Sequence, residues 1–224
     1  GIFSVADELR KLTGVEKIKV GNDANVAALG EQWRGGGRGF DSIVMVTLGT
    51  GVGGGIILNG KILTGSNGAA GEIGHLLVNP HEKRTCCCGK KGCLEQYSSA
   101  TGITRMSKEK LEQTDTPSEL RQYDHPITGL ELFKAYKNHD ALAKEIVDSN
   151  DYLGKGLSHV AAVVDPQAFV IGGGVSKNGQ IVLDVVQEKY EQDVMFALKG
   201  KEFRLAELGN DAGIYGGACL ILQN

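Results

Sequence analysis

Residues 42–58 read SIVMVTLGTGVGGGIIL, which is an apolar run, a glycine-rich centre and a second apolar run. The first run is typical of a buried strand, and the second leads to Asn59-Gly60, a pair that favours a tight hairpin turn. The glycines satisfy G-x-G-x-x-G on spacing alone. That fingerprint must open a helix, however, and the residues that follow here are typical of another strand. The stretch therefore predicts a hairpin with a glycine turn.

The glycine turn predicts a close approach of backbone N–H groups to a phosphate, to which Thr50 can add a hydroxyl donor. A second glycine run ends the apolar segment AFVI and leaves bare backbone, against which a nucleotide base or ribose can lie. No G-x-x-x-x-G-K-S/T motif occurs in the sequence. The alternative for each run is a turn without a ligand. The candidate nucleotide-binding residues are Gly49, Thr50, Gly51, Gly53, Gly172, Gly173 and Gly174.

Helical and extended patterns alternate on both sides of this hairpin. The spacing predicts helices over residues 4–12, 21–33 and 182–198, and mainly helical structure over 98–159 with breaks near Pro117 and Pro126. Strands are expected over residues 18–20, 42–48, 55–65 and 168–172. Because strands and helices alternate along the chain, we expect an α/β fold.

Composition and charge exclude several kinds of partner. The formal net charge is -3, so there is no dominant positive field and nucleic acid is not expected as a partner. No apolar run reaches the roughly 18 residues of a membrane helix, and no secretory signal is visible. We therefore expect a cytoplasmic protein without a membrane partner.

Four of the five cysteines lie in TCCCGKKGC, residues 85–93. Cys86, Cys88 and Cys93 form C-x-C-x4-C, with intervening glycines that allow tight turns. Three thiolates are one ligand short of a closed tetrahedral zinc site, and His75 in GAAGEIGH is the best fourth ligand. The sequence predicts a structural zinc ion on these four residues, although Cys87 can replace a neighbour and His81 is a second choice for the histidine.

Other uses of the thiols have less support. A disulfide is disfavoured because there is no secretory signal and because the nearest pairings close small, strained rings. No C-x-x-C redox motif occurs in the chain. Free or redox-active thiols are the alternative to zinc. Cys219 lies in the apolar tail ACLIL, where we expect a core residue.

Asp23 lies in N-D-A-N between a predicted strand and a predicted helix. Capping the helix is the commonest use of aspartate there. The alternative is a general base, which phosphoryl transfer to a sugar hydroxyl group requires. Asn22 can position the same hydroxyl group. Glu72 and Glu95 lie next to predicted zinc ligands, so zinc binding would direct both carboxylates to one place and form a polyol pocket.

Together these segments resemble the ROK family of sugar kinases and repressors. In order, the likeness is carried by GNDANVAALGE, VTLGTGVGGGII, GAAGEIGH, CxCGxxGCLE, VIGGGVS and LGNDAGIYGGA. It runs over nearly the whole chain, and within the family it is greatest to bacterial glucokinases.

The resemblance implies an actin-like, hexokinase-type (ribonuclease H-like) ATPase fold, with a mixed sheet, flanking helices and a zinc-bound loop. It also implies ATP-dependent phosphorylation of glucose at the 6-hydroxyl group, with Mg²⁺ accompanying ATP, in a homodimer or homotetramer. Asp23 would be the base, and the glycine runs would bind ATP. The residues that would bind the sugar are Asn22, Asp23, Glu72, His75 and Glu95.

One departure concerns the start of the chain. Kinases of this type begin with a strand that carries D-x-G-G-T, and residues 1–224 contain no such motif. We therefore expect residues 1–20 to be a remnant of an N-terminal lobe and hinge. Residues 21–224 should form the C-terminal lobe, with the sugar-binding and zinc segment at 71–97. On this interpretation the chain is nearly inactive by itself.

Three other functions stay open. A sugar-sensing repressor of the same family needs a DNA-binding module ahead of the kinase lobe, but it needs neither Asp23 nor an intact glycine phosphate loop. A kinase for fructose, mannose, N-acetylglucosamine or N-acetylmannosamine is a second alternative, because the sequence shows only the polar anchors of the pocket. A non-catalytic zinc module leaves the glycine runs unexplained.

Overall fold

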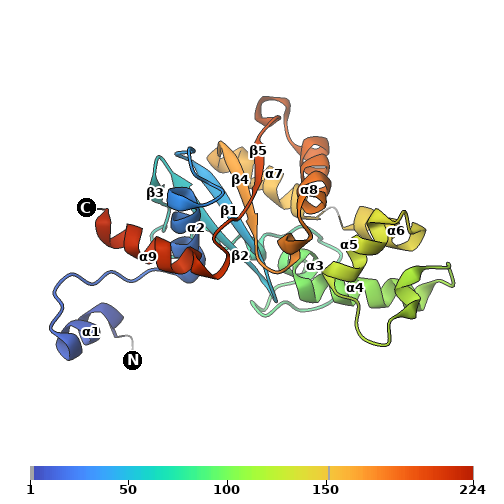
Figure 1. Cartoon of the computed structure of the whole chain (residues 1–224), viewed down its shortest axis with the longest axis horizontal. Coiled ribbons are helices and arrows are strands. Elements are labelled where there is room, and N and C mark those ends of the chain that lie inside the picture. The colour runs from blue at the N-terminus through green and yellow to red at the C-terminus, as the bar shows by residue number, and fades with distance from the viewer. Residues whose placement is uncertain (1–2, 151, 224) are drawn as a thin grey trace.

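A computed structural model describes residues 3–150 and 152–223. Within them the centre is a five-stranded sheet in the order β3-β2-β1-β4-β5 (Figure 1). β1 is antiparallel to β2 and parallel to β4, and β4 is parallel to β5. The predicted α/β fold with a mixed sheet is therefore confirmed. The strands are β1 Ile43–Leu48, β2 Val52–Leu58, β3 Lys61–Ile62, β4 Ala168–Gly172 and β5 Glu202–Leu205.

Helices occupy most of the remaining described chain. The helices predicted over residues 4–12 and 21–33 are confirmed, and the one predicted over 182–198 ends at Asp193 before a short 3₁₀ turn. The α-helices are α1 Val5–Thr13, α2 Asp23–Arg34, α3 Glu95–Ser98, α4 Ala100–Gln113, α5 Gly129–Lys137, α6 Ala141–Ser149, α7 Tyr152–Val164, α8 Gln180–Asp193 and α9 Ala212–Leu222. The 3₁₀ turns are η1 Ile73–His75, η2 Glu119–Gln122, η3 Val175–Asn178, η4 Phe196–Leu198 and η5 Gly209–Asp211.

The sheet is buried on both faces. Successive side chains of a strand point to opposite faces, so Ile43 and Met45 of β1 join a cluster with α2 and α9. Val44 and Val46 join the larger cluster, to which α7 and α8 contribute. These two helix pairs lie on opposite sides of the sheet (Figure 1). The chain therefore forms a three-layer sandwich, and Cys219 is a core residue as predicted.

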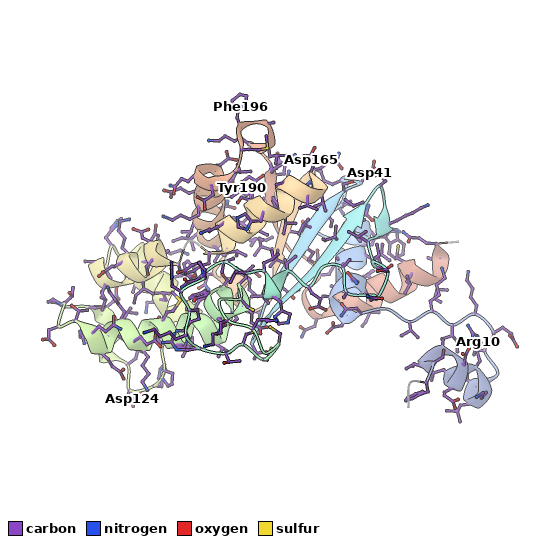
Figure 2. All side chains as sticks on the ribbon, turned by 180° about the vertical axis from the view of Figure 1, so that it is seen from behind. Arg10, Asp41, Asp124, Asp165, Tyr190 and Phe196 are labelled. Atoms are coloured by element: carbon purple, nitrogen blue, oxygen red, sulfur yellow. The ribbon has the colours of Figure 1, made fainter. Side chains whose placement is uncertain are left out.

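An aromatic cluster holds α8 against the sheet. Tyr190 is fully buried, and its ring centroid lies 5.4 Å from those of both Phe169 and Phe203. Its hydroxyl group donates to the Leu198 carbonyl oxygen at 2.7 Å. Figure 2, which shows the molecule from behind, places Tyr190 beside the helices on this face. The ring supplies apolar burial while its polar tip finds a partner, as buried tyrosine requires.

α2 and α9 cross in direct backbone contact. A Cβ atom at Gly30 would lie 2.1 Å from the Ala212 carbonyl oxygen, and one at Gly216 would lie 1.7 Å from the Val26 carbonyl oxygen. No side chain fits between the helices at either glycine. The N-terminal ends of the two helices are thereby fixed relative to each other.

Two parts of the sequence interpretation were wrong or incomplete. Residues 18–20 form no strand, because nothing in the described chain pairs with them and Val20 is 57% exposed. β5 was not expected.

α1 contains no buried residue and lies apart from the sheet (Figure 1). The division of the chain at residue 20 stays a prediction. Among the described helices, none has the length and apolarity that crossing a membrane requires.

Candidate functional site

A cavity of about 500 Å³ opens where the β1–β2 turn meets the first turns of α2 and α9. Its lining includes Thr47, Asn210 and Gly213, which the sequence analysis did not single out as site residues. The segment around Asn210 was recognised only as part of a motif. The predicted site residues that line the cavity are Asp23, Gly49, Thr50, Gly51, Gly53, Glu95 and Gly173.

Asp23 is the first residue of α2. Its side chain is exposed and lines the cavity, and its Oδ1 atom accepts a hydrogen bond from the Ala24 N–H at 2.8 Å. The helix cap is Asn22, whose Oδ1 atom accepts from the Asn25 N–H at 3.2 Å. Capping is therefore assigned to Asn22, and the carboxylate of Asp23 is left facing a cavity.

The β1–β2 turn presents backbone to the same cavity. The hydrogen bond that closes the turn runs from Gly49 N to Gly51 O at 3.0 Å, and it uses neither the N–H of Thr50 nor that of Gly51. Ala100 N–H donates to the Gly49 carbonyl oxygen at 2.8 Å, and the Thr101 hydroxyl group donates to the Thr50 carbonyl oxygen at 2.9 Å. The first turn of α4 therefore holds the carbonyl side of the turn, and N–H groups are available for an anion.

Glu95 connects the cysteine segment to the glycine turn. Its Oε2 atom accepts from the Val52 N–H at 3.1 Å, and its Oε1 atom accepts from the Cys87 thiol at 3.3 Å. A Cβ atom at Gly51 would lie 2.1 Å from Oε2, so glycine is required there for the carboxylate to approach. A movement of the Glu95 carboxylate would therefore break its hydrogen bond with the Val52 N–H and change the contacts of the turn.

The remaining predicted site residues do not line this cavity. Asn22 lines a separate cavity of about 580 Å³. Glu72 is exposed at the start of η1, and Gly172 and Gly174 flank Gly173 without reaching the lining. His75 lies in the cysteine cluster instead. The structure thus brings together the base candidate, the glycine turn and one acidic residue, but not the full predicted sugar-binding set.

Glu31 is a buried carboxylate that sequence analysis missed. It is fully buried in α2, its Oε1 atom accepts from the Leu208 N–H at 2.8 Å, and its Oε2 atom accepts from the N–H groups of Gly36 and Glu207 at 2.8 and 3.0 Å. The segment it holds leads into Asn210 of the cavity lining. Only long-range contacts distinguish this glutamate from a surface one, so the sequence carried no signal.

Replacing Glu31 by alanine should lower the free energy of unfolding by about 2–4 kcal/mol, because buried N–H groups lose their acceptor. Urea denaturation measures this change. Glu207→Ala is the matched control, since Glu207 is exposed and should change stability by less than about 0.5 kcal/mol. Equal effects in the two variants would show that the three hydrogen bonds of Glu31 do not stabilise the fold.

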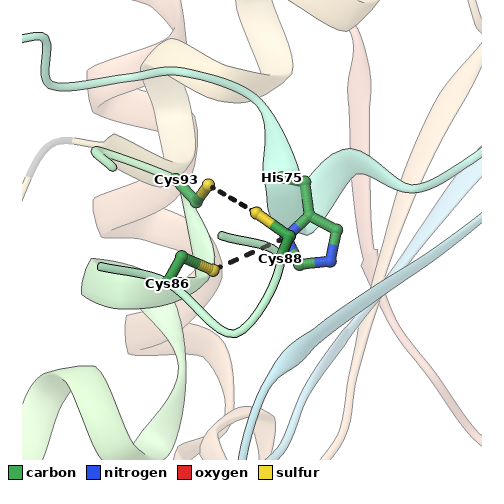
Figure 3. A group of neighbouring side chains, drawn as sticks. All are labelled: His75, Cys86, Cys88 and Cys93. Atoms are coloured by element: carbon green, nitrogen blue, oxygen red, sulfur yellow. Dashed lines mark hydrogen bonds between the residues drawn. The ribbon is translucent and has the colours of Figure 1, made fainter. Parts of the chain in front are cut away.

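The predicted metal ligands lie together (Figure 3). One potential ligand atom from each of His75, Cys86, Cys88 and Cys93 falls within 4.8 Å of the others. The Nδ1 atom of His75 is 3.7 Å from the Cys86 sulfur, and the sulfurs of Cys88 and Cys93 are 3.5 Å apart. Around tetrahedral zinc, two sulfurs lie roughly 3.8 Å apart and a nitrogen and a sulfur roughly 3.6 Å. The cluster therefore fits zinc, and His81 belongs to no metal-binding group in the described chain.

Burial makes the Cys93 thiol of this cluster unfavourable for negative charge on its own. It raises the pKa of the Cys93 thiol to about 12, and hydrogen bonds with Cys88 and Cys86 act in the same direction. The pKa of the Cys88 thiol is lowered, chiefly by a hydrogen bond from the Lys90 backbone N–H. A cation among the sulfurs offsets the cost of burying thiolates. All cysteines in the described residues are free thiols.

The segment around the cluster has little regular structure. Short bridges pair Leu77 with Cys93 and Thr85 with Lys91, and Cys86 N–H donates to the Lys90 carbonyl oxygen at 2.7 Å. These contacts close a tight turn between the cysteines. A metal ion is the natural cross-link for such a loop.

Sequence comparison relates the chain to known proteins. The profile of the ROK family matches residues 3–224. A glucokinase of Halalkalibacterium halodurans is 44% identical over 225 aligned residues, which cover 99% of this chain and 68% of that protein.

Structural comparison also finds proteins of the ROK family. A ROK family glucokinase from Streptomyces griseus, solved with glucose and AMPPNP, matches with a TM-score of 0.82 and 35% identity, over 98% of this chain and 72% of that one. A ROK family transcriptional regulator, a homologue of the E. coli MLC protein, matches with a TM-score of 0.83 and 27% identity, over 97% of this chain and 55% of that one.

Proposed function

This chain belongs to the ROK family, and from that premise we propose that it transfers the γ-phosphoryl group of ATP to the 6-hydroxyl group of glucose. The single observation that carries the proposal is the cavity that places Asp23 beside the β1–β2 glycine turn. A carboxylate next to a turn rich in backbone N–H groups can pair a proton acceptor with a phosphate cradle.

In the proposed reaction Asp23 accepts the proton of the sugar hydroxyl group as its oxygen attacks the γ-phosphorus atom. The N–H groups of Thr50 and Gly51 bind the phosphate oxygens, whose negative charge they stabilise through the transfer. Gly173 lines the same cavity and is proposed to lie against the nucleoside. ATP reaches kinases as its Mg²⁺ complex, and the divalent ion screens the phosphate charge.

The sugar-binding residues remain proposals. Glu95 lines the cavity and is held by the Val52 N–H, which supports its role as an acceptor for sugar hydroxyl groups. Asn22, Glu72 and His75 are proposed for the same role on the resemblance alone.

We also propose that His75, Cys86, Cys88 and Cys93 hold a structural zinc ion, on the support of their ligand distances and burial. Such an ion contributes cross-linking rather than chemistry. It would fix the loop that ends at Glu95. A homo-oligomer and a cytoplasmic location stay predictions of the sequence analysis.

The test supplies the zinc-loaded chain with glucose and ATP labelled in the γ-phosphate. We expect labelled glucose 6-phosphate and measurable glucose binding by calorimetry, with N-acetylglucosamine and fructose bound more weakly. Labelled ATP detects slow as well as fast turnover. If N-acetylglucosamine bound more tightly than glucose, we would conclude that N-acetylglucosamine is the substrate.

A sugar-sensing regulator is the second candidate, favoured by the structural likeness to the transcriptional regulator. The two candidates share the fold, so the fold cannot decide between them. The same experiment separates them. A sensor binds the sugar without transferring phosphate, and its sugar affinity does not depend on ATP.

A further inference from the structure

We propose that this chain contains a second zinc coordination set, formed by His75, Cys86, Cys87 and Glu95, which shares two ligands with the first. The potential ligand atoms of these four residues also lie within 4.8 Å of one another. The set depends on Cys87, the middle cysteine of the triplet, which the first set does not use.

The distances of the second set are those of a zinc site. The Cys87 sulfur lies 3.3 Å from Glu95 Oε1 and 3.9 Å from the Cys86 sulfur. The Cys86 sulfur lies 3.8 Å from Glu95 Oε1. Around tetrahedral zinc, a carboxylate oxygen and a sulfur lie roughly 3.5 Å apart and two sulfurs roughly 3.8 Å. The atoms therefore already stand at the separations that one ion requires.

The two sets are alternatives for one ion. A neutral histidine has one unprotonated ring nitrogen, which offers one lone pair. The unprotonated nitrogen of His75 can therefore be a ligand in only one of the two sets at a time. Zinc favours thiolates among the available ligands. The first set has three cysteines and the second has two, so the ion should occupy the first set while Cys88 and Cys93 are available. Cys88 is the exposed thiol of the first set, whereas Cys86 and Cys93 are buried, so solvent and competing ligands reach Cys88 first.

Movement of the ion would have a consequence for the cavity. In the second set Glu95 Oε1 is a metal ligand and is no longer free to accept a sugar hydroxyl group. This step rests on the proposed function, whereas the coordination set itself does not. Binding of the ion in the second set would therefore lower the affinity for sugar, and it would occur when Cys88 is lost as a ligand.

The test uses Co²⁺ and Zn²⁺ as probes of Cys88→Ser and of Cys87→Ser/Cys88→Ser. Cys88→Ser should bind one ion, with sulfur-to-cobalt absorption about two thirds of the wild-type value, because two thiolates replace three. The double variant should bind at least tenfold more weakly than Cys88→Ser. Metal binding by Cys88→Ser that is unaffected by loss of Cys87 would overturn the proposal, and so would absence of metal from a folded Cys88→Ser chain.

Glucose affinity is measured on the same variants. Zinc-loaded Cys88→Ser should bind glucose about tenfold or more weakly than wild type, since a charged hydrogen-bond acceptor is lost. If the cobalt spectra support the second set but glucose affinity is unchanged, the role of Glu95 in sugar binding is wrong and the metal site stands.

If Cys88→Ser does not fold, the exposed Cys87 offers another measurement. Transfer of zinc from the wild-type chain to a chelator should be at least threefold faster than from Cys87→Ser, because the second set holds the ion more weakly during release. Equal transfer rates would overturn the proposal.

Discussion

Replacing Asp23 by asparagine is expected to lower kcat for glucose phosphorylation by about 10²–10⁴. Asparagine has the same shape and can still accept the Ala24 N–H through its Oδ1 atom, as the aspartate does at 2.8 Å. The helix cap is Asn22 rather than Asp23, so α2 keeps its N-terminal hydrogen bond. What the amide loses is the capacity to accept a proton from the sugar hydroxyl group.

The chain contains a matched control for this change. α2 and α9 both open with Asn-Asp-Ala, at residues 22–24 and 210–212, and the two helices pack together. Asp23 lines the cavity, whereas Asp211 does not. Asp211 lies at the N-cap position of α9, one position earlier in its helix than Asp23 in α2. Asp211→Asn therefore removes the same charge from a helix N-terminus and should change kcat less than threefold.

Turnover of labelled ATP gives kcat, and calorimetry gives glucose affinity. A base acts in the transition state, so Asp23→Asn should change glucose affinity much less than it changes kcat. If Asp23→Asn lost affinity and kcat equally, Asp23 would be a sugar ligand rather than the base. If both aspartate variants lost kcat equally, the effect would come from charge at the helix ends.

Local patterns predicted the parts of the fold that local patterns determine. The run SIVMVTL predicted β1 because a doubly covered strand is continuously apolar, and Asn59-Gly60 predicted the turn into β3. The cysteine spacing predicted the cluster with His75 because tight turns at glycine bring such thiols together. In the first two cases the signal lay within a few residues of the feature, and in the third His75 lies eleven residues before Cys86.

Features that depend on distant contacts were missed. β5 is short, alternates charged and apolar residues and is recognisable only by its pairing with β4. Residues 18–20 have strand-like side chains but no neighbouring strand. In the sequence Glu31 cannot be distinguished from a surface glutamate. Its hydrogen bond from the Leu208 N–H is visible only in the structure. The contact between Cys87 and Glu95 was missed for the same reason, since it requires the cysteine turn to fold back on α3.

Loss of zinc is expected to unfold residues 76–93 while leaving the sheet intact. Structural zinc contributes about 10–16 kcal/mol of apparent binding free energy in small metal-dependent folds, which is comparable to the whole stability of a domain at about 5–15 kcal/mol. The regular pairing of this loop is limited to short bridges, and of its residues only Leu76 and Val78 pack in a core cluster of the sheet. The rest of that cluster and the cluster on the other face come from other parts of the chain, so we expect the sheet to persist without the ion.

Cys86→Ser and His75→Ala test this expectation, because each removes a ligand that both proposed coordination sets use. Both should abolish zinc binding in elemental analysis and increase hydrogen exchange across residues 76–93, with protection retained in β1 and β4. Cys87→Ser is the control for removing a thiol from the same turn, and it should keep both zinc and protection.

Glucose affinity then shows whether the ion does more than order the loop. Both zinc-free variants should lose affinity for glucose by at least about tenfold. Glu95 follows Cys93 closely in the chain, so it loses its fixed position when the loop unfolds. His75→Ala should lose more than Cys86→Ser only if the imidazole also contacts the sugar. Zinc retained by His75→Ala would mean that the fourth ligand is not His75. A loop that stays protected without the ion would mean that its hydrogen bonds and packing suffice to hold Glu95 in place.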